Sequence, residues 1–182
     1  MEMKPIVLGF AGRIASGKST LAKEISQHLG WQYVSFGDYV RTVARSRNLE
    51  ESREVLQNLG ASLINQGVEK FCQSVLAQVN WKPLQPLVID GIRHVEVLKT
   101  LRRIISPLEF RLVFICIDKK IRNARLNERN IIHDQNYQDL EAHSTEVQVQ
   151  TLLPTIADLT VDGTKKTEEL VQEIVSWMQK SQ

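Results

Sequence analysis

The sequence has few of the residues from which disulfide networks or zinc sites are built. Its 182 residues include only two cysteines, Cys72 and Cys116, and four scattered histidines. Neither a disulfide-stapled scaffold nor a structural zinc site is therefore expected to organise the fold. Both cysteines stand among apolar neighbours, so we expect them to be buried free thiols.

An excess of one charge and long apolar runs are also missing. The formal net charge is only +2, which does not mark the chain as a binder of nucleic acid or membrane. No apolar run approaches the roughly 20 residues that span a bilayer. Pro5 and the glycines that follow it do not form a signal peptide. We expect a cytoplasmic protein that binds neither membrane nor nucleic acid.

Short apolar runs alternate with segments of helical spacing along the whole chain. We predict strands at 6–10, 31–36, 86–90, 111–118 and 158–162. This alternation is typical of an α/β fold, in which helices cover both faces of a parallel sheet and ligands bind at the carboxyl ends of the strands. The length favours a single domain over 1–182. The helical stretch at 38–80 is longer than a crossover needs, so we expect an insertion beside the site.

The segment "GRIASGKST" follows the first predicted strand and opens the first predicted helix. Its pattern of Gly12, four residues, Gly17, Lys18 and Ser19 is that of the phosphate-binding loop. Glycines let the backbone wrap closely around phosphate, and the helix N-terminus adds a partial positive charge. We expect Lys18 to reach the β and γ phosphates of ATP, and Ser19 to bind Mg²⁺. The expected ATP-binding set is Gly12, Ala15, Ser16, Gly17, Lys18, Ser19 and Thr20.

Three aspartates flank predicted strands and invite different interpretations. Asp90 closes "LVID", where a carboxylate opposite the phosphate-binding loop would serve Mg²⁺. A helix cap or a turn before Gly91 is the alternative for this residue. Asp118 is expected to cap the following helix, and Asp158 to make a structural hydrogen bond.

Several further motifs together resemble the P-loop nucleoside and nucleotide monophosphate kinases, including the adenylate kinases. The motifs are "SFGDYVR" (35–41), "VIDGIR" (88–93), "ICIDKKIRNARLNER" (115–129) and "ADLTVDGTKKTEEL" (157–170). "REVLQNLG" (53–60) and "HSTE" (143–146) are similar to phage-type deoxynucleoside monophosphate kinases. The resemblance implies a P-loop NTPase three-layer sandwich with strand order 2-3-1-4-5, a helical acceptor-binding insertion at 38–80 and a short lid at 127–143.

The resemblance also implies roles for four arginines. Arg41 and Arg93 would bind the acceptor phosphate, Arg125 would lie over the ATP base, and Arg129 would reach the transferring phosphate. Guanidinium groups suit this task because they bind phosphate oxygens bidentately. We expect the remaining arginines of these regions to be solvated surface residues: Arg45, Arg47, Arg102, Arg103 and Arg122.

Asp38 is open to three interpretations: N-cap of the helix that starts at 39, acceptor contact, or general base. The leading functional prediction is transfer of the γ-phosphoryl group of Mg-ATP to a small acceptor, a ribo- or deoxynucleoside monophosphate. One alternative is a kinase of a hydroxyl group on a nucleoside, a coenzyme precursor or a polynucleotide end. Another is an ATP-binding regulatory module without kinase activity.

Overall fold

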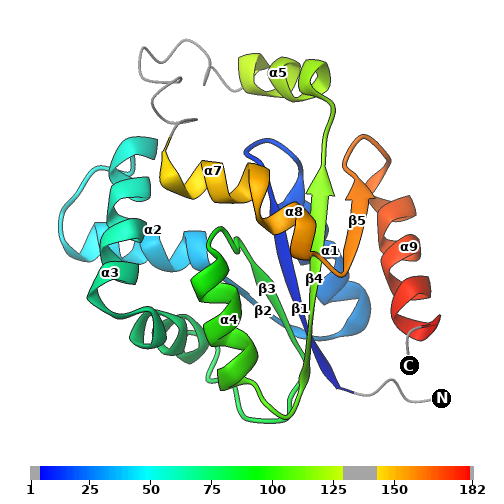
Figure 1. Cartoon of the computed structure of the whole chain (residues 1–182), viewed down its shortest axis with the longest axis horizontal. Coiled ribbons are helices and arrows are strands. Elements are labelled where there is room, and N and C mark those ends of the chain that lie inside the picture. Colours follow the sequence, from blue (N-terminus) through cyan, green and yellow to red (C-terminus); the bar gives the residue numbers. More distant parts are fainter. Residues whose placement is uncertain (1–4, 129–142, 181–182) are drawn as a thin grey trace.

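The computed structural model describes residues 5–128 and 143–180, in which five parallel strands form one sheet (Figure 1). The strands run in the order β2-β3-β1-β4-β5, which confirms the predicted topology. Their bounds are Ile6–Gly12 (β1), Gln32–Ser35 (β2), Leu87–Asp90 (β3), Glu109–Cys116 (β4) and Leu159–Asp162 (β5).

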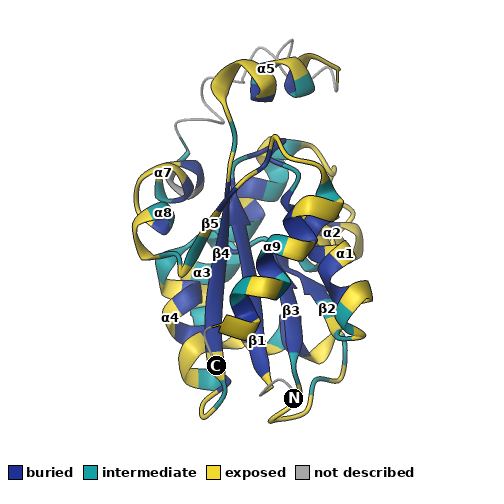
Figure 2. Cartoon of the chain, turned by 90° about the vertical axis from the view of Figure 1, so that its right-hand side faces the viewer, coloured by how far each residue is buried: buried dark blue, intermediate teal, exposed yellow. Residues whose placement is uncertain are grey.

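Helices cover both faces of this sheet. Their bounds are Lys18–Leu29 (α1), Phe36–Ser46 (α2), Arg53–Ala77 (α3), Val95–Ile104 (α4), Lys119–Glu128 (α5), Ser144–Thr151 (α7), Leu153–Ile156 (α8) and Thr167–Lys180 (α9). One apolar cluster joins α1 and α9 to the sheet, and a second joins α2, α3, α4, α7 and α8 to its other face. Every residue of β1 and β3 is buried, as a parallel sheet between two helical layers requires (Figure 2).

The start of α2 differs from the prediction that Asp38 caps this helix. The cap is Ser35, whose hydroxyl oxygen accepts a hydrogen bond from the backbone N–H of Asp38 at 3.2 Å. The helix begins earlier than expected because Phe36 is buried and packs edge-to-face against Phe71, with ring centroids 5.1 Å apart. Asp38 therefore lies in the first helical turn, where its carboxylate is exposed to solvent.

The long helix α3 contains two glycines, Gly60 and Gly67, and is interrupted at one of them. Gly67 has φ 146° and ψ 99°, which is outside the helical region. Gly60 continues the helix. Further along the chain, Pro154 lies in the first turn of α8 and separates it from α7. These two departures from a regular helix follow from the backbone freedom of glycine and the missing N–H of proline.

The two cysteines lie in different environments. Cys72 is buried between α3 and α4, as predicted, but Cys116 is exposed, which corrects the prediction that both thiols are buried. Cys116 is the last residue of β4, and its thiol donates to the Val161 carbonyl oxygen at 3.2 Å.

Two of the predicted structural aspartates are confirmed. Asp118 caps α5, because its carboxylate accepts a hydrogen bond from the backbone N–H of Lys120 at 2.8 Å. The carboxylate of Asp158 accepts a hydrogen bond from the backbone N–H of Leu112 at 2.7 Å, and so ties β5 to β4.

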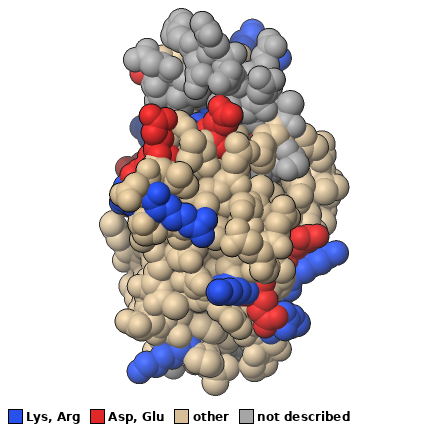
Figure 3. Space-filling model, turned by 90° about the vertical axis from the view of Figure 1, so that its left-hand side faces the viewer, with Lys and Arg blue, Asp and Glu red and all other residues tan. Residues whose placement is uncertain are grey.

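The surface of the described residues carries no obvious single-sign region on the face shown in Figure 3. Basic and acidic side chains are scattered there among other residues. None of the helices within 5–128 and 143–180 is long and apolar enough to cross a membrane. The carboxyl ends of the parallel strands meet at one edge of the sheet, below α5 (Figure 1).

Candidate active site

The loop between β1 and α1 leaves the first backbone N–H groups of α1 available to a ligand. Gly17 precedes the helix with φ 90°, and no side chain caps this end. Ala15 also has a left-handed backbone, with φ 64°. A Cβ atom on Gly12 would lie 2.8 Å from the Ser16 hydroxyl oxygen and 2.9 Å from the Ile115 carbonyl oxygen, so only glycine fits. Uncapped N–H groups and the helix dipole together favour an anion here.

Lys18 is the first residue of α1, and its side chain is only 9% exposed. Burial lowers its pKa to about 8, and the positive charge of Arg93 acts in the same direction. The carboxylates of Asp90 and Glu146 oppose this shift, and the positive charge of Arg53 adds to it. Three cationic side chains thus face two carboxylates, and an anionic ligand would supply the missing negative charge. Ser19 follows Lys18 and is exposed.

Asp90 ends β3 and is paired in register with Phe10 of β1, close to the start of the loop. Its carboxylate is 3% exposed, and one oxygen accepts a hydrogen bond from the Tyr33 hydroxyl at 3.1 Å. The other oxygen, Oδ1, is buried with no hydrogen-bond partner. A buried, unsatisfied carboxylate oxygen is costly unless a ligand or ion satisfies it.

The oxygen donors of Asp90 and Ser19 therefore fit a magnesium ion, which prefers carboxylate, hydroxyl and phosphate oxygens. In the described part of the chain no group of three or more His, Cys, Asp or Glu side chains could hold a metal ion alone. A magnesium ion would accordingly share its coordination between these side chains, phosphate oxygens and water.

A cavity lies beside this cluster, between α2, α3 and the β3–α4 connection. About 770 Å³ of space lies between its walls, and this volume includes the part that is open to solvent. Arg41, Arg53 and Arg93 line it from three different elements. Its remaining lining is largely apolar and includes Phe36 and Phe71. The cavity thus combines guanidinium groups that suit an anion with apolar surface that suits a ring.

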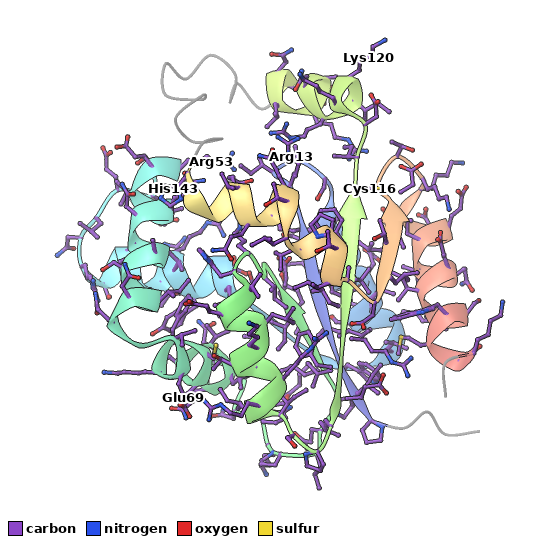
Figure 4. The ribbon with its side chains drawn as sticks, viewed as in Figure 1. Arg13, Arg53, Glu69, Cys116, Lys120 and His143 are labelled. Atoms are coloured by element: carbon purple, nitrogen blue, oxygen red, sulfur yellow. The ribbon has the colours of Figure 1, made fainter. Side chains whose placement is uncertain are left out.

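The structure brings Arg41 and Asp38 together on the exposed side of this cavity. Their side chains form an ion pair at 3.0 Å, and both are about half exposed. Arg53, which the sequence analysis did not single out, begins α3 directly after its cap residue Ser52. Figure 4 shows Arg53 and Arg13 at the same end of the molecule, with Glu69 at the opposite end.

Arg93 is held by Glu146, an acidic residue of the "HSTE" motif (143–146). Its Nη1 donates to the carboxylate of Glu146 on α7, and the Glu146 side chain is only 1% exposed. The Arg93 side chain is 27% exposed and lines the cavity. The "HSTE" motif lies at the start of α7, which begins at Ser144.

Helix α5 is attached to the phosphate-binding loop by two arginines. The Arg125 guanidinium donates to the carbonyl oxygens of Ala15 at 3.2 Å and Gly163 at 3.1 Å, so it bridges this loop and the segment after β5. Arg122 donates from Nε to the Ile14 carbonyl oxygen at 3.3 Å. The side chain of Arg122 is only 2% exposed, which corrects the prediction that it is a surface residue.

The burial of Arg122 could have been predicted from the helical spacing of its neighbours. Arg125 and Leu126 lie three and four residues after Arg122 on α5, so all three share one helical face. Leu126 packs on Ile14 and Ala15, so this face of α5 lies against the loop. Arg129, the other arginine predicted to contact the donor, lies outside the described residues.

Solved structures with the same fold include several kinases. A putative kinase from Chloroflexus aurantiacus matches all of this chain, and is fully covered by it, with a TM-score of 0.65 and 19% identity. A shikimate kinase from Aquifex aeolicus matches 93% of this chain and is 94% covered, with a TM-score of 0.61 and 19% identity. A gluconokinase from Sinorhizobium meliloti gives a TM-score of 0.55 and 16% identity, with 98% and 94% coverage. At these identities the likeness shows the P-loop kinase fold alone.

Sequence relatives cover nearly the whole chain. A UPF0200/UPF0201 protein of Archaeoglobus fulgidus is 29% identical over 180 residues, which are 96% of this chain and 54% of that relative. This chain thus spans about half the length of that protein. A UPF0200 protein of Aeropyrum pernix is 25% identical over 168 residues, or 91% of this chain and 88% of the relative.

A family model described as an AAA domain matches residues 11–142. The match begins just before the phosphate-binding loop and includes Asp90, Arg93 and Arg125. It extends over more than half of the sequence. Together with the strand order and the loop, this match shows that the chain belongs to the AAA domain family.

Proposed function

We propose that this protein transfers the γ-phosphoryl group of Mg-ATP to a small anionic acceptor, a ribo- or deoxynucleoside monophosphate. The observation that carries the proposal is the cavity lined by Arg41, Arg53 and Arg93, which lies beside the phosphate-binding loop. A hydrolase has no need of a second anion-binding cavity. A kinase requires one, because donor and acceptor must be held together in line.

The donor half of the site is formed by the loop and α5. Lys18 and the uncapped N–H groups of α1 bind the β and γ phosphates, and Arg125 lies over the ATP base. Asp90 and Ser19 hold Mg²⁺, which when bound neutralises charge on the β and γ phosphates. Arg129 is assigned to the transferring phosphate group by resemblance alone.

The acceptor half is formed by the cavity. Arg41, Arg53 and Arg93 bind the acceptor phosphate, and the apolar wall with Phe36 and Phe71 packs against the base. The acceptor phosphate is already ionised at neutral pH, so this reaction needs no general base. Catalysis then comes mainly from holding the reactants in line and from neutralising charge.

Within this proposal, residues 1–182 form one cytoplasmic kinase domain. The helical insertion at 38–80 closes over the acceptor, and the segment 127–143 acts as a short lid, although 129–142 lie outside the described residues. Closure would exclude water and so suppress hydrolysis of ATP.

The test is a coupled assay of ADP release with Mg-ATP and each ribo- and deoxynucleoside monophosphate, next to a series of hydroxyl acceptors. We expect turnover with at least one monophosphate and its loss in Lys18→Ala. Lys99→Ala is the matched control, because Lys99 lies exposed on α4 away from the loop. Binding of ATP without turnover on any acceptor would contradict the proposal and favour a regulatory module.

A kinase of a hydroxyl group is the second candidate, favoured by the position of Asp38. Its carboxylate is exposed and pairs with Arg41, which lines the cavity. A hydroxyl acceptor would need such a base. Asp38→Asn separates the two reactions, since a hydroxyl kinase would lose roughly 100-fold or more of its rate, whereas a phosphate kinase would change little.

A further inference from the structure

The buried carboxylate of Glu146 is the feature of the site that the proposed function does not use. Glu146 is 1% exposed and comes from α7, an element that lies 53 residues beyond Arg93 in the sequence. It contacts Nη1 of Arg93, and its charge also acts on Lys18. Burying an ion pair costs desolvation energy, which an apolar pair of similar size would avoid. A buried pair at the edge of an anion-binding cavity therefore calls for a reason other than stability.

A second contact from α7 fixes the same stretch of backbone. The side-chain oxygen of Gln148 accepts a hydrogen bond from the Val95 N–H at 2.9 Å, at the start of α4. The side-chain nitrogen of Gln148 lies 3.4 Å from Nδ1 of His94. Burial and the nearby Arg93 charge lower the pKa of His94 to about 4, so its ring is neutral at pH 7. Two side chains of α7 thus hold residues 93–95.

The contact with Glu146 leaves most of the Arg93 guanidinium for another ligand. A guanidinium carries five N–H donors on three nitrogens, and the ion pair involves Nη1. Arg93 also remains 27% exposed in the cavity. A carboxylate bound to Nη1 fixes the plane of the guanidinium group and so the directions of its remaining N–H groups. Bidentate binding of a phosphate requires such a fixed plane.

We propose that Glu146 is a positioning residue, which orients Arg93 for the phosphate of the acceptor. This inference rests on the proposed function, since it assigns to Glu146 a role in the same acceptor site. Glu146 acts through Arg93 and does not itself touch the acceptor. Gln148 supports the same orientation of Arg93 by fixing the backbone of the residues that follow Arg93.

The first experiment is a double-mutant cycle on the acceptor kinetics with Glu146→Gln and Arg93→Ala. We expect Glu146→Gln to lower kcat/KM for the acceptor about tenfold while changing KM for ATP less than twofold. In the Arg93→Ala background the same substitution should change kcat/KM less than twofold, because the group through which it acts is gone. Equal effects in both backgrounds, or tighter acceptor binding in Glu146→Gln, would overturn the inference.

The matched control is Glu69→Gln, which also removes one carboxylate charge. Glu69 on α3 forms an exposed ion pair with Arg103 on α4. Figure 4 shows Glu69 at the end of the molecule opposite Arg53. This variant should keep the wild-type kinetics. Circular dichroism and thermal unfolding of each variant show whether Glu146→Gln remains folded under the assay conditions.

A second measurement decides the inference without a known acceptor. Phenylglyoxal modifies free guanidinium groups, and peptide mass spectrometry gives its rate at Arg93 in the whole protein. We expect Arg93 to react several-fold faster in Glu146→Gln than in the wild type and in Glu69→Gln. An unchanged rate would show that Glu146 does not hold Arg93. Absence of all kinase activity would instead contradict the proposed function, and the labelling result would still stand.

Discussion

Lys18 is the residue whose ionisation depends most directly on what the site holds. Without a ligand it is buried beside Arg93, and its pKa is lowered to about 8. The β and γ phosphates of a bound nucleotide would favour its charged form and raise the pKa again. The charge of Lys18 and the binding of nucleotide are therefore linked.

This linkage predicts that nucleotide affinity falls as the pH rises above about 8. Below that pH, Lys18 is already charged in the free protein, and binding takes up no proton. Above it, binding requires protonation of Lys18, so affinity should fall up to about tenfold per pH unit. Isothermal titration in buffers of different ionisation enthalpy would measure the proton uptake. Lys18→Arg should show weaker binding with no proton uptake, and the same uptake in this variant would contradict the assignment.

Asp90 is the second residue whose environment predicts a function. Its unsatisfied oxygen should make the Asp90→Asn variant no less stable to heat than the wild type, while ATP binding loses most of its dependence on Mg²⁺. The control is Asp158→Asn, because Asp158 makes a structural hydrogen bond to Leu112. It should lower Tm and leave the magnesium dependence unchanged. Differential scanning fluorimetry with and without Mg-ATP measures both quantities, and a reversed pattern would refute the magnesium role.

Helix α5 shows how an element can shape a site without belonging to the sheet. Arg122, Arg125 and Leu126 attach one of its faces to the loop that precedes α1. The conformation of this loop, in which Ala15 has φ 64°, is thus supported by α5 as well as by β1. The position of α5 over the carboxyl edge of the sheet is visible in Figures 1 and 2.

Removal of Arg122 should therefore weaken the loop as well as the helix. We expect Arg122→Ala to destabilise the protein by about 2 kcal/mol, and to raise KM for ATP, because the Ile14 carbonyl loses its partner. Lys120→Ala is the control on the same helix, since Lys120 is exposed. Urea unfolding and ATP titration measure the two effects. If Lys120→Ala produced comparable losses, the attachment through Arg122 would have no special role.

The whole molecule places its two thiols in opposite situations. Cys72 is buried where α3 packs on α4, and burial raises its pKa to about 12. Cys116 is exposed at the carboxyl edge. The packing of the molecule as a whole, and not the local sequence, decides which thiol can react.

A disulfide reagent such as DTNB at pH 8 should accordingly label one thiol in the native protein and two after unfolding in urea. The thiolate is the reactive form, so both the burial and the raised pKa protect Cys72 until the protein unfolds. Cys116→Ser should abolish the fast native reaction. Two fast thiols in the folded protein would contradict the burial of Cys72.

Much of the fold could be predicted from the sequence because its signals are local. The loop before α1 and the cap of α5 by Asp118 depend on residues that are close in sequence. The strand order joins strands that are far apart in the chain, and it was predicted from the resemblance to the P-loop monophosphate kinases. The errors arose where burial over long distances decides. Ser35 and not Asp38 caps α2 because Phe36 packs on Phe71, and Cys116 is exposed at the end of β4 although its sequence neighbours are apolar.

The sequence by itself determined that a phosphate-binding loop follows a buried strand, since spacing and residue types within nine positions are sufficient to specify that loop. Only the tertiary structure decided which charges meet around it. Arg122 and Ile14 lie 108 residues apart, and Arg93 and Glu146 lie 53 apart. Such pairs form because the packing of α5 on the loop and of α7 on the sheet leaves buried charges that must find partners, and no local pattern encodes that requirement.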